Sequence, residues 1–244
     1  MRYKIDAACY SAIGKIRKNN EDNFYFDGKS MQEKNFGTEE CIITSFYQDE
    51  NRLFSVFDGM GGESRGERAS FLATTELKIF DKKSPIDWKE YADKSNKKIC
   101  SEMDKSNRMG STVAGIQFLE DCISIMNLGD SRIYEYNTEG LRQVSQDHTK
   151  LVDKNRKPLL TEHLGVFEDE LILHPYQKLL FYEDVKKILL CSDGITDMVD
   201  DNTIEKILSE NNDSKKCAEL LIKESLSNGG KDNATIIVFT INNN

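Results

Sequence analysis

Several acidic residues of this 244-residue sequence stand beside glycine or asparagine, where an apolar segment ends or begins. They are Asp58 before Gly59, Asp193 before Gly194, Asp130 after Gly129, Asp232 before Asn233, and the pair Glu21-Asp22 between asparagines. Each Asp-Gly alone is a common turn. As a set, clustered carboxylates with accessible glycine carbonyls are the oxygen ligands that Mg²⁺ and Mn²⁺ prefer. The set therefore indicates a site for hard divalent cations.

One stretch supports a competing interpretation. Gly62-Glu63-Ser64-Arg65-Gly66 matches the Gly-x-Ser-x-Gly pattern of serine hydrolases, in which the serine lies on a tight turn directly after a strand. Asp58–Gly61 separates Ser64 from the preceding apolar segment, so a glycine-rich entry into a helix explains the same residues. A serine hydrolase would depend on Ser64 and would be indifferent to chelators.

Short apolar runs bounded by turn residues predict the strands that position these side chains. The predicted strands are Tyr3–Tyr10, Leu53–Phe57, Thr112–Phe118, Cys122–Asn127, Arg132–Tyr136, Lys187–Cys191 and Thr235–Phe239. Apolar residues at helical spacing predict helices over Glu63–Phe80, Asp87–Met103, Thr203–Ser209 and Lys216–Leu226. Close spacing suggests an antiparallel meander over 111–145. The stretch 146–175, which holds all three histidines, is predicted to be rich in loops.

Strands grouped apart from helices favour an α+β fold over alternating βαβ units. No linker-like segment interrupts the pattern, so residues 1–244 are predicted to form a single domain. The six cysteines are scattered and form no Cys-x-x-Cys pair, which is typical of free thiols in a reducing compartment.

The formal net charge of −9 argues against nucleic-acid binding and against adhesion to anionic membrane surfaces. The sequence contains neither a signal peptide nor an apolar run of membrane-spanning length. We therefore expect a cytoplasmic protein.

The acidic residues belong to a series of motifs that runs through nearly the whole chain. In order they are Arg17-Lys18-Asn19-Asn20-Glu21-Asp22, Val56–Gly62, Gly110-Ser111-Thr112, Asn127–Arg132, Leu189–Gly194 and Gly230–Thr235. This ordered set resembles the metal-dependent type 2C (PPM) protein serine/threonine phosphatases, and in particular the compact bacterial members. The resemblance implies a four-layer αββα sandwich of two mostly antiparallel sheets flanked by helices, with the metals at one end.

The resemblance also implies a role for each matching residue. Asp58 would bridge two Mn²⁺ or Mg²⁺ ions, with the Gly59 carbonyl as a further ligand. The remaining ligands implied are Asp193 and Asp232 for the first ion, Glu21 for the second, and Asp130 with Asp193 for a third, weaker ion. Arg17 would bind the phosphate, and Asp22 would accept a hydrogen bond from metal-bound water. Water shared by the two ions would attack phosphorus directly, without a phospho-enzyme.

Two features depart from the family pattern. Animal members place a histidine, a proposed general acid, where this chain has Met60, so His148 or His163 would have to substitute unless water protonates the leaving group. Relatives also insert a mobile flap where this chain has only Lys150–Pro158, which predicts a shortened flap and a more open cleft.

The sequence thus predicts a monomeric metal-dependent phosphatase acting on phosphoserine and phosphothreonine in proteins, among them the targets of a serine/threonine kinase. The alternative is a catalytically silent member of the family that binds a phosphoprotein or a regulatory partner.

Overall fold

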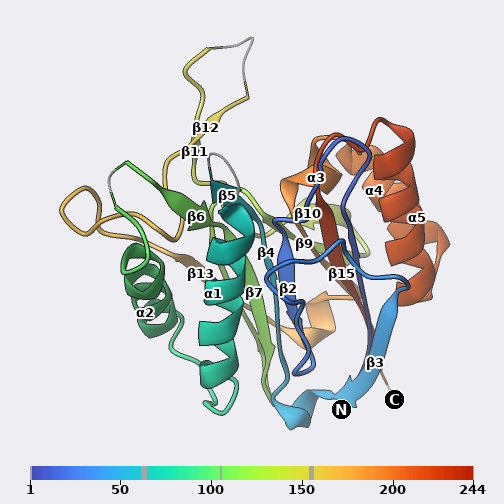
Figure 1. The fold of residues 1–244 in the computed structure, drawn as a ribbon. Helices are drawn as coiled ribbons and strands as arrows, with labels where there is room; N and C mark the ends of the chain where they lie inside the picture. Colours follow the sequence, from blue (N-terminus) through green and yellow to red (C-terminus); the bar gives the residue numbers. More distant parts are fainter. Residues whose placement is uncertain (1, 62–64, 105, 154–156, 244) are drawn as a thin grey trace.

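The computed structural model describes residues 2–61, 65–104, 106–153 and 157–243. In these residues two antiparallel sheets lie face to face between helices (Figure 1). The six-stranded sheet has the order β10 (Gly140–Gln143), β9 (Arg132–Asn137), β14 (Lys187–Cys191), β15 (Ala234–Asn243), β1 (Tyr3–Ala12) and β3 (Ile42–Tyr47). The five-stranded sheet has the order β13 (Tyr176–Leu180), β8 (Ile123–Leu128), β7 (Val113–Phe118), β4 (Leu53–Phe57) and β2 (Asn23–Phe26).

Helices cover the outer face of each sheet, which gives the expected αββα order of layers (Figure 1). The helices α1 (Gly66–Phe80) and α2 (Trp88–Cys100) pack on the five-stranded sheet. On the six-stranded sheet lie α4 (Asp201–Glu210), α5 (Ser214–Ser227) and the short α3 (Asp193–Thr196). The apolar stripe predicted for the first helix, which includes Leu72, Leu77 and Phe80, is buried as expected.

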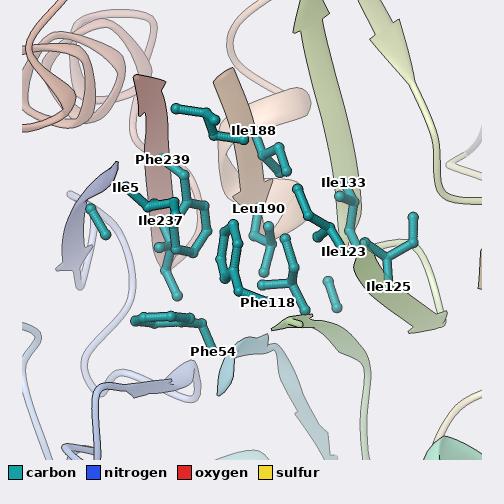
Figure 2. Close-up of a cluster of buried hydrophobic side chains, with 14 of the residues drawn as sticks. Ile5, Phe54, Phe118, Ile123, Ile125, Ile133, Ile188, Leu190, Ile237 and Phe239 are labelled. Carbon is teal, nitrogen blue, oxygen red and sulfur yellow. The ribbon is translucent and has the colours of Figure 1, made fainter. Parts of the chain in front are cut away.

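The layer between the two sheets is an apolar core that fixes their separation. Figure 2 shows Phe54 and Phe118 from the five-stranded sheet meeting Phe239 and Leu190 from the other. The rings of Phe54 and Phe118 each have their centroids 5.0 Å from that of Phe239. Because such interiors are close-packed, the strand ends of one sheet are held in a defined position relative to those of the other.

The predicted meander over 111–145 is wrong at its centre. The pairs β7–β8 and β9–β10 form as expected, but β8 and β9 belong to different sheets. The chain crosses between the sheets at Gly129, which has a φ of +109°. The strand β9 then pairs with β14, whose residues come about fifty positions later, and local spacing carries no signal for such a partner.

The stretch 146–175 is mostly irregular, as predicted, but it contains the small hairpin β11 (Thr149–Lys150) and β12 (Leu159–Leu160). A second small ribbon pairs β5 (Gly59–Gly61) with β6 (Met109–Ser111). Both ribbons lie at the end of the sandwich drawn uppermost in Figure 1.

Gly194 brings α3 against the start of β15, and this contact offers a test of the packing. A Cβ at Gly194 would lie 1.9 Å from the Asn233 carbonyl oxygen. We expect Gly194→Ala to lower the free energy of unfolding in urea by about 1–3 kcal/mol, because backbone must move to admit the methyl. Equal stability of Gly194→Ala and the unmodified protein would contradict the packing described.

Candidate active site

The acidic residues singled out in the sequence converge on one cavity. Its volume is about 420 Å³, and its lining includes Arg17, Glu21, Asp58, Gly59, Asp130, Asp193 and Asp232. Glu21 and Asp58 come from segments flanking strands of the five-stranded sheet, whereas Arg17, Asp193 and Asp232 flank strands of the six-stranded sheet. Asp130 lies in the crossing between the sheets. Asp22, only 1% exposed, does not line the cavity.

Backbone contacts fix Asp58 and Gly59 at the end of β4. The Asp58 amide donates to Thr112 Oγ1 at 3.1 Å, and its carbonyl accepts from the Thr112 amide at 2.9 Å. The Gly59 amide donates to the Glu21 carbonyl at 3.2 Å. A Cβ at Gly59 would lie 2.1 Å from the Gly66 carbonyl oxygen, so only glycine allows this approach. Thr112 therefore holds the end of β4 through both its hydroxyl and its amide.

Asn233 joins three segments beneath the cavity, a role that the sequence analysis missed. Its Oδ1 accepts from the Glu21 amide at 2.8 Å, and its Nδ2 donates to the carbonyls of Ile13 and Asn19 at 2.9 and 3.0 Å. The side chain is 3% exposed. The sequence signal that could have indicated this role is the position of an amide side chain directly between Asp232 and a buried strand.

Asp22 is held behind the cavity by hydroxyl groups. Its Oδ2 accepts from Ser192 Oγ at 2.8 Å, and the same Oγ accepts from the Thr235 amide at 3.0 Å. Burial, opposed by these hydroxyl hydrogen bonds and reinforced by the charges of Asp193 and Asp232, raises the pKa of Asp22 to about 7. The carboxylate can therefore exchange a proton near neutral pH.

Burial, together with mutual repulsion, opposes ionisation of the carboxylates around the cavity. Burial, followed by the charges of Asp193, Asp22 and Asp130, raises the pKa of Asp58 well above its ordinary range. Burial and the charge of Asp193 also raise the pKa of Asp130, to about 6. Carboxylates shifted in this direction are stabilised in their ionised form by added positive charge.

Two side-chain cations supply part of that charge. Arg17 Nη2 donates to Asp232 Oδ2 at 2.7 Å, and Arg17 Nη1 lies 3.6 Å from Glu21 Oε2. Lys157 Nζ donates to Asp193 Oδ2, and also to Asp197 Oδ2 at 2.7 Å. The position of Lys157 was not predicted, because nothing in its local sequence relates it to an aspartate 36 positions away.

The donor set fits divalent ions. Asp193 Oδ1 is buried and has no hydrogen-bond partner among the described residues, so one oxygen of this carboxylate is available to a ligand. Within the same part of the chain, no three His, Cys, Asp or Glu side chains already converge on one point as ligands of an ion. Asp232 instead binds Arg17, so an ion binding there would compete with this side chain, whereas Asp193 binds Lys157 through Oδ2 alone.

The groups considered for acid catalysis lie beside the cavity or away from it. Met60 lines both the acidic cavity and a neighbouring one of about 320 Å³, and His163 lines the latter. Burial lowers the pKa of His163, which favours the neutral ring. His148 Nδ1 lies 3.2 Å from the Gly129 amide nitrogen, which places this ring in the crossing between the sheets. Ser64, the residue of the serine-hydrolase interpretation, falls outside the described residues.

Comparisons with known proteins agree with this architecture. The serine/threonine phosphatase Stp of Listeria welshimeri is 29% identical over 92% of this chain and 91% of its own length. The serine/threonine protein phosphatase PstP of Mycobacterium tuberculosis is 29% identical over 95% of this chain and 44% of its own length. A crystal structure of the PstP catalytic domain with two manganese ions superposes with a TM-score of 0.74 at 28% identity, covering 99% of this chain and 100% of that domain. No protein-family model matches the chain.

A two-sheet sandwich with a carboxylate-lined cavity at one end defines a type 2C phosphatase domain. Along nearly its whole length, the chain is similar to bacterial PPM serine/threonine phosphatases. No helix of the described residues has the length and apolar character needed to cross a membrane.

The raised pKa values predict how stability depends on pH without metal. For Asp22 and Asp130 the folded state keeps protons that the unfolded chain releases, so their contribution to stability is complete below about pH 4 and is lost as pH rises through about 6 for Asp130 and about 7 for Asp22. The pKa of Asp58 shifts in the same direction. Asp22→Asn removes one of these groups. In EDTA, we expect the melting temperature of this variant to rise relative to the unmodified protein as pH increases over that interval. A difference that stays constant or reverses in thermal unfolding would contradict the shift at Asp22.

Proposed function

We propose that this chain hydrolyses phosphoserine and phosphothreonine monoesters in proteins, using two Mn²⁺ or Mg²⁺ ions. The main support is the acidic cavity, in which the buried Asp193 Oδ1 lacks a partner among the described residues. The manganese complex of the similar PstP domain supports the choice of metal. Relatives named serine/threonine phosphatases support the substrate class.

The residues that would hold the ions are Asp58, the Gly59 carbonyl, Glu21, Asp193 and Asp232. When bound, divalent ions in such a site offset the charge of the phosphoryl group and lower the pKa of the water that attacks phosphorus. The rigid backbone around Gly59 and Asn233 keeps the ligands in place before any ion binds.

Arg17 is suited to bind the substrate phosphate. Its side chain is 44% exposed and stands at the cavity wall, so its guanidinium can reach an anion entering from solvent. Release of Asp232 and Glu21 would free its donors for the paired hydrogen bonds that arginine makes to phosphate. Asp22, buried behind the ligands, would accept a hydrogen bond from water in the site.

The chain would act as a single phosphatase domain, as a monomer in the cytoplasm, on phosphoproteins that a serine/threonine kinase generates. The silent phosphoprotein-binding alternative is less favoured, because that role would not require the complete set of Arg17, Asp58, Asp193 and Asp232 around one cavity.

Removing the central carboxylate tests the function. With Mn²⁺ present, we expect the unmodified protein to dephosphorylate a phosphothreonine peptide and excess EDTA to abolish the activity. Asp58→Asn should lower kcat by at least about 10³-fold, because a neutral amide cannot hold ions together as a shared carboxylate does. Thermal unfolding should show that the variant remains folded.

Asp93→Asn is the matched control, because this exposed aspartate lies on α2 and does not line the cavity. It should retain the activity of the unmodified protein. A folded Asp58→Asn protein with full activity would refute the metal assignment, and activity that persists in EDTA would favour the Ser64-dependent alternative.

A further inference from the structure

Lys157 places a positive charge among three aspartates at one side of the active-site cavity. Its Nζ bonds to Asp193 Oδ2 and Asp197 Oδ2. Lys157 lines the active-site cavity and also an adjoining one of about 80 Å³, and Asp130 and Asp193 line both. The ammonium therefore contacts Asp193 directly and shares both cavities with Asp130.

The other cationic side chain that lines the smaller cavity, Arg132, already forms an ion pair. Arg132 Nη2 binds Asp147 Oδ2 at 2.7 Å. Asp130, Asp193 and Asp197 therefore depend on Lys157 for nearby side-chain charge within the described lining of that cavity. Two carboxylates accept hydrogen bonds from Lys157 Nζ, which favours the charged ammonium.

The two oxygens of Asp193 are in different situations. Oδ2 accepts from Lys157, whereas Oδ1 is buried without a hydrogen-bond partner in the described part of the chain. One oxygen can thus serve an ion shared with Asp58 and Asp232 while the other stays with the lysine. A second divalent ion held between Asp193 and Asp130 would meet the ammonium at short range, and like charges repel strongly in a partly buried site.

We propose that the ammonium of Lys157 takes the place of a third divalent ion beside Asp130 and Asp193, so that this phosphatase binds two ions rather than three. The inference rests on the proposed metal-dependent function. It gives Lys157 a positioning role, because its ion pairs also hold the chain next to Pro158 and Leu159 at the wall of the cavity.

Metal stoichiometry tests the proposal without reference to activity. Native mass spectrometry and isothermal titration with Mn²⁺ should give two ions for the unmodified protein and three for Lys157→Met, which keeps the length of the side chain but not its charge. Lys157→Arg should bind two ions. The double variant Lys157→Met/Asp130→Asn should return to two, which would locate the added ion at Asp130. Lys150→Met, at an exposed position of the same hairpin, is the matched control and should bind two.

Three ions on the unmodified protein, or two on a folded Lys157→Met protein, would overturn the proposal. Lys157→Ala provides a second uncharged variant if Lys157→Met does not fold, and the count on the unmodified protein tests the proposal by itself. If the unmodified protein binds no Mn²⁺ at all, the metal-dependent function fails and this inference falls with it. A count of three, in contrast, would leave the proposed function intact.

Discussion

Repulsion between buried carboxylates is the constraint on which the rest of this structure depends. Burial and neighbouring charges raise the pKa values of Asp22, Asp58 and Asp130 in the same direction, so the cavity resists the charge state that a metal site requires. A fold that keeps these groups together must supply the opposing free energy elsewhere. Here the apolar layer between the two sheets does so, together with backbone contacts such as the one that excludes a Cβ at Gly59.

The position of the cavity follows from the same constraint. Asp58 ends a strand of one sheet and Asp232 precedes a strand of the other, so their separation is set by how the sheets pack. The aromatic contacts of Phe54 and Phe118 with Phe239 lie in that layer (Figure 2). Asn233 then adjusts the local path of the chain by binding backbone from two other segments. The apolar core thus fixes the distance between the sheets, and buried polar side chains such as Asn233 fix the positions of the ligand residues.

Features encoded within a few residues were predictable from the sequence, whereas features that depend on distant partners were not. An apolar run ending in Asp58-Gly59 specifies both the strand and the residue at its end, and β4 and β14 have the predicted bounds. The crossing at Gly129 could not be foreseen, because the partner of β9 is a strand far along the chain. The role of Lys157 was not predicted for the same reason, because an ion pair between residues 36 positions apart leaves no local sequence pattern.

The two side-chain cations divide the acidic cavity into regions with different access to ions. Arg17, 44% exposed, and Lys157, 50% exposed, each pair with two carboxylates, so an entering ion or phosphate competes with ion pairs that are open to water. Lys157 is bound by two aspartates at once and shares a second, smaller cavity with Asp130. Displacing Lys157 would break both ion pairs. An ion that entered without displacing it would lie close to the ammonium. The Lys157 side differs in geometry: the lysine binds only Oδ2 of Asp193 and leaves the buried Oδ1 without a partner among the described residues, which favours ion binding around Asp58 and Asp232.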